Sequence, residues 1–407
     1  MAITALTDSD YSALFKRAYG DYGDQLYGSG VEDVLESQIP KTFDFDGNER
    51  HFPLKVGFGG GVGFGSLPAA NRSKNVDVYY TTKQAYARLN LDRKTIVQSR
   101  GKMGAFIEAT KEETEGKLKS FRRAQAMTLF NDGTGILFQF SGSTSGTASA
   151  PVITVLTTGT YRYRSGFLEE GEYVNVNSDA SVFEITAVTS TTVTLARLSG
   201  SLDLTGIGAG THSVYLQNSK DVAPQGILSA VGFTTGTLYN VAYQRRFAPY
   251  INTKSSATLL TTDDLNAAVL QMKNSSGECP NLIIPSVTQM NLLLNQLEDK
   301  KRYCTLDSSS NKLSKKATVS FQGIEFMSVD GPIPIVSSRY VRNDQVLLVN
   351  TKKMFRDHAE AFGWFDNDGT VLLRMANDDA YEARYGGYYE NFINPLYQGV
   401  ISGNAVS

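Results

Sequence analysis

The chain has 407 residues, enough for about two to three domains with a sizeable apolar core. Its 41% hydrophobic and 20% charged residues are ordinary for a globular protein and exclude wholesale disorder. With 39 lysines and arginines against 41 aspartates and glutamates the net charge is −2, which excludes a protein that grips nucleic acid through a large basic excess.

Residues 1–40 predict two short amphipathic helices separated by a glycine-rich linker. Apolar residues recur at helical spacing from Tyr11 to Tyr19 and again from Val31 to Ile39, with Pro40 beyond the second helix. Such short helices bury little apolar surface on their own. We therefore expect this segment to be an arm that docks elsewhere.

Residues 41–99 predict a long β-hairpin. Two extended stretches flank a turn at Asp46-Gly47-Asn48, and Asn75 to Leu91 is expected to be one long strand. Between them lies the stretch 57–65, in which six of nine residues are glycine. An isolated two-stranded ribbon is marginally stable in water, so this hairpin is expected to need a neighbour to lie on.

The longest predicted helix runs from about Gly101 to Asn131, with one apolar face at helical spacing. Glutamates fill its first half, and lysines and arginines its second half, an order that complements the helix macrodipole. At 1.5 Å per residue such a helix spans ~45 Å. This length is more than a compact domain of this size needs.

Composition changes at Ser141, where a region rich in serine, threonine, glycine and valine begins. Residues 141–222 predict a small all-β module, either a barrel or a sandwich. Its strand signals lie at 152–156, 172–176, 183–188, 192–195 and 213–216. Beyond it the sequence predicts helices at 263–272 and 287–299, and strands at 282–285, 318–326, 346–349, 370–375 and 381–401.

No catalytic or cofactor-binding motif is found. The glycine stretch has no GxGxxG, and Ser66 stands where a Walker A motif needs lysine, so we interpret it as a hairpin tip. The three histidines lie in different segments, none beside a cysteine, which argues against zinc. The segments 44–48 and 366–369 place glycine too early for a calcium loop and are interpreted as hairpin turns. We expect no enzyme, no metal and no cofactor.

The cysteines and the N-terminus indicate the compartment. Cys279 and Cys304 form no CxxC pair and are too few for a disulfide framework, which favours folding in a reducing environment. The first residues lack the basic start and apolar core of a signal peptide, and apolar runs stay far below the ~20 residues of a membrane span. We expect a protein made in a cytoplasm, without a membrane segment.

The order of these elements resembles that of the major capsid proteins of tailed double-stranded DNA phages, which have the HK97-like fold. Two stretches, Cys279–Ser286 and Phe321–Phe326, are similar to strands of that family's axial domain. The closing stretch Asn394–Ile401 is similar to its final strand and tail. The resemblance covers nearly the whole chain apart from residues 141–222.

The resemblance implies an α+β subunit with the parts of that family in order. They are an N-terminal arm (1–40), an extended β-hairpin loop (41–99), a spine helix with the first part of a peripheral domain (100–140), an inserted barrel- or sandwich-like domain (141–222), an axial domain (223–350), and the C-terminal part of the peripheral domain with a tail (351–407). Some members cross-link through a lysine of the extended loop, for which Lys55 and Lys74 are candidates by position only.

The implied function is structural. Copies of the chain would form hexamers and pentamers of an icosahedral shell, assembled in the host bacterial cytoplasm, which becomes the capsid of the virion. The shell would enclose double-stranded DNA through weak, non-specific contacts, and separate scaffolding, portal and decoration proteins are implied partners. Two alternatives stay open: the shell of an encapsulin-like bacterial nanocompartment and, from another class, a β-rich surface or adhesion protein.

Candidate residues for contact between subunits come from the hairpin and from a basic stretch at its base and at the start of the long helix. This stretch consists of Lys83, Arg88, Arg93, Lys94, Arg100 and Lys102. This basic stretch is interpreted as a solvated or salt-bridged face, and the alternative is contact with a neighbouring subunit or packaged DNA. The candidates are Lys55, Gly57, Phe58, Gly60, Phe64, Lys74, Arg93, Lys94 and Arg100.

Overall fold

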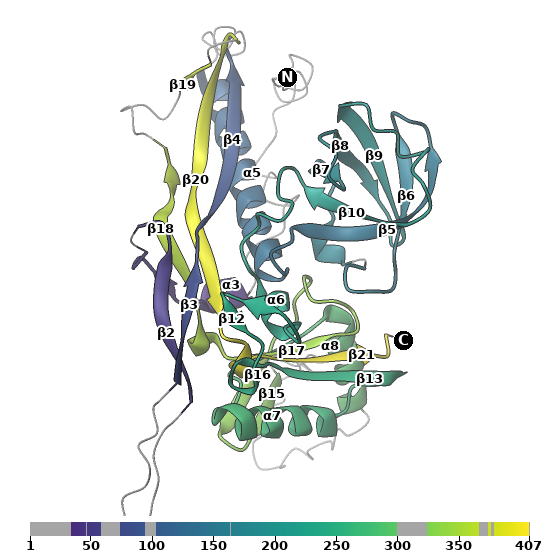
Figure 1. Ribbon diagram of the computed structural model, residues 1–407. Helices are drawn as coiled ribbons and strands as arrows, with labels where there is room; N and C mark the ends of the chain where they lie inside the picture. The colour runs from purple at the N-terminus through teal and green to yellow at the C-terminus, as the bar shows by residue number, and fades with distance from the viewer. Residues whose placement is uncertain are drawn as a thin grey trace, which may run out of the picture.

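The computed structural model describes residues 34–45, 47–57, 74–93, 103–162, 164–298, 324–365, 373–375 and 378–406. In these residues helices and strands are mixed, as expected. A long sheet, a closed barrel and a six-stranded sheet are arranged around one long helix (Figure 1).

The long sheet is built around β20, which pairs antiparallel with β4 and with β18. Its strands are β1 (Lys41–Thr42), β4 (Lys83–Asp92), β18 (Met354–Trp364), β19 (Leu373–Arg374) and β20 (Ala380–Ile393). Strand β18 was not predicted, because Arg356, Asp357 and His358 interrupt the apolar alternation that marks a strand. All three side chains are buried in the fold.

The segment expected to be one long hairpin is divided between two sheets. Strands β2 (Arg50–Gly57) and β3 (Lys74–Tyr80) form an antiparallel hairpin, whereas β4 leaves it to pair with β20. The prediction of a single strand from Asn75 to Leu91 is therefore wrong. The hairpin turn predicted at 44–48 is also wrong, because the strands on either side of it join different sheets: β1 pairs with β18 and β2 pairs with β3. Val78 and Leu89 are buried in different apolar clusters, which accounts for the break between β3 and β4.

The long helix α5 (Met103–Leu129) confirms the prediction for this region; its 27 residues span ~40 Å. Phe121 of α5 packs edge-on against Phe362 and Tyr385 of the long sheet, at ring-centroid distances of 5.1 and 5.2 Å. Of the expected arm, the structure describes α3 (Val34–Gln38), whose Leu35 is buried. Residues 1–33 lie outside the described part of the chain.

The β-rich region forms a closed barrel rather than a sandwich. Its strands, in the order around the barrel, are β10 (Thr211–Leu216), β5 (Ile136–Gly146), β6 (Pro151–Val155), β9 (Thr192–Ser199), β8 (Val182–Val188) and β7 (Tyr173–Val176). The five expected strand signals are all strands here. The barrel begins earlier than expected, because the serine- and glycine-rich run from Ser141 lies inside β5.

The six-stranded sheet carries helices α7 (Thr262–Ser276) and α8 (Val287–Glu298), both as predicted. Its strands, in spatial order, are β13 (Tyr250–Thr258), β21 (Gly399–Asn404), β17 (Val346–Val349), β14 (Leu282–Pro285), β16 (Gly331–Ile335) and β15 (Ile324–Ser328). The aromatic run 381–401, expected to be strand-like with Pro395 near its end, is divided at Pro395, so that β20 and β21 belong to different sheets.

Short elements join these units. They are α6 (Ile227–Val231), β11 (Thr237–Leu238), β12 (Val241–Ala242) and the single 3-10 turns at Ser165–Phe167, Arg245–Phe247, Thr351–Lys353 and Pro395–Tyr397. Among the helices in the described ranges, none has the length and apolar character needed to cross a bilayer.

Candidate functional site

The buried carboxylate of Asp357 holds the base of the β2–β3 hairpin. Arg50, the first residue of β2, and Tyr80, the last residue of β3, are register partners, and we call this end the hairpin root. Asp357 of β18 is fully buried and forms a 2.7 Å ion pair with Arg50. It also accepts hydrogen bonds from the hydroxyls of Tyr80 (3.2 Å) and Thr42 (2.9 Å). One carboxylate therefore joins both strands of the hairpin to the long sheet, at the point where β1 and β18 pair.

Aromatic side chains surround this ion pair. We define the aromatic cluster as Phe52, Tyr80, Tyr239, Phe355 and Phe392. Phe52 of the hairpin meets Phe392 of β20 edge-on, with ring centroids 4.9 Å apart. Burial has the largest effect on the pKa of Tyr80 and raises it, and the negative charge of Asp357 raises it further. The Tyr80 hydroxyl therefore stays protonated and donates its hydrogen bond. The hairpin root thus rests on its own chain, and the expected need for a neighbour does not apply to this end.

Three of the candidate contact residues lie together at the other end of the described hairpin. Gly57 and Lys74 are register partners, and Lys55 faces Asn75 one step nearer the root. Both lysine side chains are exposed. A Cβ atom on Gly57 would lie 3.1 Å from Cβ of Lys74, so the two strands approach closely here. Phe58, Gly60 and Phe64 lie outside the described residues.

Arg93 is far from these three residues along the fold. Strand β4 runs from the hairpin root to the opposite end of the long sheet, and Arg93 follows its last residue (Figure 1). There Arg93 forms a 3.3 Å ion pair with Asp379, and Arg88 forms a 2.7 Å ion pair with Glu382. The salt-bridged interpretation of the basic stretch holds for these two arginines. Lys94 and Arg100 lie outside the described part of the chain.

Several exposed apolar side chains lie on the six-stranded sheet and its connections, a signal that sequence reasoning did not use. The largest exposed fractions are 74% for Met327, in β15, and 69% for Val329, in the turn between β15 and β16. The others in this part of the fold are Ile251, Leu259, Leu270 and Val287. A contiguous exposed apolar patch marks a protein–protein contact, whereas single exposed apolar side chains are ordinary on a protein surface.

No group suited to metal binding occurs among the residues that the structure describes. Cys279 is a free thiol there, whereas Cys304 lies outside the described ranges. His358 is buried between Phe43, Phe362 and Tyr389, and burial, assisted by the charge of Arg356, lowers its pKa to about 4. Its imidazole is therefore neutral at physiological pH, as in a packed core residue.

No family model and no curated protein matches the sequence. A chain of the cyanophage A-1(L) capsid asymmetric unit matches the structure with a TM-score of 0.56 at 12% sequence identity, over 94% of this chain and 96% of the cyanophage chain. This chain has the fold of that capsid protein.

Two further solved structures resemble the capsid fold of this chain less closely. The holo-SrpI encapsulin complex of Synechococcus elongatus PCC 7942 matches at 8% identity and a TM-score of 0.49, over 99% of this chain and 98% of that chain. A structure of Mycobacterium phage Bobi matches at 9% identity and a TM-score of 0.44, over 98% and 99%.

Proposed function

We propose that this chain is the major capsid protein of a tailed double-stranded DNA phage, a structural subunit that assembles with copies of itself and catalyses no reaction. The observation that carries the proposal is the capsid fold shared with the cyanophage protein over 94% of the chain. Fold alone does not define function, so the surface must also suit assembly.

The surface supports assembly in two ways. The β2–β3 hairpin projects from the root at Asp357 (Figure 1), and Lys55 and Lys74, at the far end of its described part, are exposed. The six-stranded sheet presents exposed apolar side chains such as Met327 and Val329. Many weak contacts of this kind, repeated by closed symmetry, sum to a stable shell. The net charge of −2 suits a shell that encloses DNA without gripping its phosphates.

The parts of the fold take the following roles in this proposal. The hairpin is the extended loop, α5 is the spine helix, and the long sheet belongs to the peripheral domain. The six-stranded sheet is the axial domain, and the barrel is an insertion between the spine helix and that domain. The location is the virion, with assembly in the host bacterium and with scaffolding, portal and decoration proteins as partners.

The test is the size of the purified protein. We expect capsomers or closed particles in sedimentation velocity and negative-stain microscopy. The double variant Met327→Ser, Val329→Ser is expected to weaken assembly and to leave the unfolding midpoint of the subunit nearly unchanged, because both side chains already face solvent. A stable wild-type monomer at every protein and salt concentration would contradict the proposal.

The content of the particles separates the main proposal from its nearest alternative. Particles recovered from the native source are expected to contain double-stranded DNA. Particles that contain cargo protein in place of DNA would identify an encapsulin-like compartment of the same architecture. An attached, surface-located protein that never assembles would point to the β-rich adhesion alternative.

A further inference from the structure

The core of the barrel is continuous with the core of the rest of the subunit. A single cluster of buried apolar side chains includes Phe138 and Phe183 of the barrel and Leu347 and Val400 of the six-stranded sheet. An autonomous module would bury its apolar residues in a cluster of its own. The barrel therefore shares its core with the subunit that carries it.

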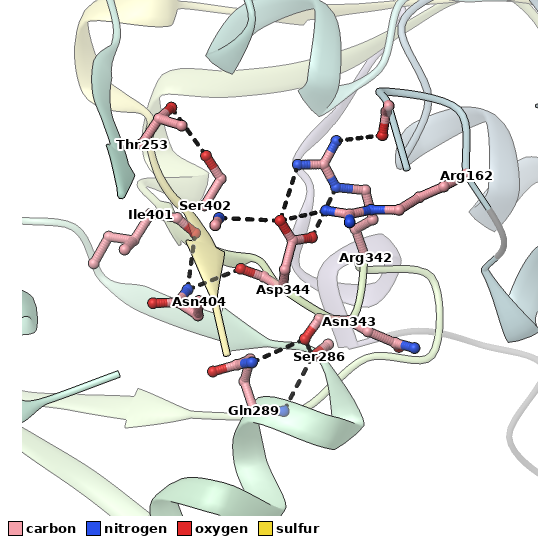
Figure 2. Close-up of polar contacts among 12 residues, drawn as sticks. Arg162, Thr253, Ser286, Gln289, Arg342, Asn343, Asp344, Ile401, Ser402 and Asn404 are labelled. Atoms are coloured by element: carbon pink, nitrogen blue, oxygen red, sulfur yellow. Dashed lines mark hydrogen bonds and ion pairs between the residues drawn. The ribbon is translucent and has the colours of Figure 1, made fainter. Parts of the chain in front are cut away.

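A network of polar contacts lies where the barrel meets the six-stranded sheet (Figure 2). We define the Asp344 junction as Arg162, Arg342, Asp344, Gly403 and Asn404. Arg162 belongs to the connection between β6 and β7 of the barrel, and its guanidinium pairs with the Asp344 carboxylate. The same carboxylate pairs with Arg342 at 2.9 Å and accepts a 3.0 Å hydrogen bond from the backbone of Gly403 in β21.

The backbone of Asp344 extends the junction into the C-terminal strand. Its carbonyl accepts a 2.8 Å hydrogen bond from the side-chain amide of Asn404 and a 3.2 Å hydrogen bond from the backbone N–H of Asn404. Next to it, the carbonyl of Asn343 accepts from Ser286 and Gln289 at the start of α8. One loop thus connects the barrel to β21 and to α8 (Figure 2).

Charge keeps the Asp344 carboxylate ionised although it is mostly buried. Burial alone would raise its pKa, but the neighbouring charges of Arg342 and Arg162 outweigh burial and hold the pKa below its ordinary value. Without Arg162 the carboxylate keeps its pair with Arg342 but loses one of its two cations and the link to the barrel. Removing Arg162 from the barrel therefore disturbs the β21 side of the junction as well.

Four further contacts fix the barrel in orientation. Arg342 donates to the carbonyl of Gly159 at 3.3 Å, and Arg339 forms a 3.3 Å ion pair with Glu169, both on the β6–β7 connection. On the side of α5, Arg123 is buried and pairs with Glu169 at 2.7 Å and with Glu172. The barrel is therefore held both by Arg339 and Arg342 and by Arg123 of α5, so loss of the contacts on one side leaves those on the other side in place.

We infer that the barrel is an internal brace of the subunit: through Asp344 it holds the C-terminal strand β21 in the six-stranded sheet. This role differs from that of a surface decoration on a loose linker. It also does not depend on shell formation, because every contact in it lies within one chain.

Hydrogen–deuterium exchange of the full-length Arg162→Gln variant tests the inference. We expect peptides covering β21 to exchange at least tenfold faster than in the wild type, although the substitution is in the barrel. The matched control is Arg197→Gln, since Arg197 donates at 3.1 Å to Leu202 within the barrel. This control is expected to leave exchange in β21 unchanged.

Thermal unfolding provides an independent readout on the same proteins. The brace predicts one transition in which the barrel and β21 lose protection together, at a lower temperature in Arg162→Gln. The inference would be overturned if β21 of Arg162→Gln exchanged at the wild-type rate, or if Arg197→Gln accelerated the exchange of β21 equally. It would also be overturned if the barrel melted in a separate transition while the amides of β21 stayed protected. Failure of the protein to form particles would instead affect only the proposed shell function.

Discussion

Arg50 and Tyr80 are register partners at the root of the hairpin, and both reach the same buried carboxylate, that of Asp357. Neighbouring side chains on one face of a two-stranded ribbon lie close enough to share a partner. The charge of Arg50 and the hydroxyl of Tyr80 thus hold the two strands to β18 at one point.

The variant Asp357→Asn should loosen the hairpin root. The amide keeps the shape of the carboxylate but removes the charge that Arg50 meets at 2.7 Å. Hydrogen bonds to a charged group contribute about 1.5–3 kcal/mol, and we expect a loss of this size in the free energy of unfolding. Exchange of amides in β2 and β3 should increase, and assembly measured by sedimentation should fall.

The control for this variant is Asp77→Asn, which removes a charge from the exposed face of the same hairpin. Asp77 pairs with His51 at 2.9 Å, and both side chains are more than half exposed. Exposed ion pairs contribute little to stability, so this variant should behave as the wild type. An equal effect of both variants on exchange would contradict a special role of Asp357.

Gly386 of β20 is expected to tolerate no side chain. A Cβ atom there would lie 2.1 Å from the carbonyl oxygen of Ala85 in β4. Gly386→Ala should therefore lower the free energy of unfolding by about 1–3 kcal/mol or more in urea denaturation. Its register partner in β18 is Gly363, where the nearest atom to a Cβ is 3.9 Å away. Gly363→Ala is the matched control, and an equally large loss there would refute the steric explanation.

Glu390 should make the stability of the subunit depend on pH. Burial raises its pKa from 4.5 to about 8, against hydrogen bonds from the backbones of Gln225 and Asn391. The folded chain therefore keeps a proton that the unfolded chain releases above about pH 4.5. This contribution to stability is fully present below about pH 4.5, is lost as the pH rises to about 8, and then stays level.

The variant Glu390→Gln removes this titration and keeps an oxygen for the two backbone donors. We expect it to match the wild type near pH 5 and to be more stable above pH 8, by on the order of 2–4 kcal/mol in urea denaturation. Glu360→Gln, at an exposed position of β18, is the control. A stability difference that is the same at pH 5 and pH 9 would contradict burial as the cause.

Deleting residues 57–65 should separate folding from assembly. The root with Arg50, Tyr80 and Asp357 remains in this variant, so the long sheet and α5 are expected to fold, as judged by circular dichroism and the thermal midpoint. Particle formation should be weakened. If the deletion unfolds the subunit, the glycine-rich stretch contributes to the core and not to contacts between subunits.

The features that could be predicted from the sequence are those encoded by local patterns. Helix α5 follows from apolar spacing and charge order, and helix α7 from its apolar spacing over 263–272. The barrel strands follow from short β-branched runs bounded by turn residues. Each of these patterns lies within the helix or strand itself, so it can be recognised without knowing which segment the element packs against.

The features that were missed depend on partners far away in the chain. Strand β18 contains Arg356, Asp357 and His358, which are buried only because Glu36, Arg50 and surrounding aromatic rings meet them there. The break of the predicted 75–91 strand at Thr81 has the same origin, since β3 and β4 differ in the sheet they join. A local pattern cannot report which of two sheets a strand will enter.

By itself, the sequence determined the mixture of long helix, hairpin and β-rich module, and the absence of any recognisable catalytic motif. The resemblance in the order of these elements also pointed to a capsid fold, which the structural match bears out. Only the tertiary structure decided that Asp357 holds the hairpin and that Asp344 joins the barrel to β21. The physical reason is that a buried carboxylate acquires its role from the cations around it, and Arg50 lies 307 positions from Asp357 and Arg162 lies 182 from Asp344.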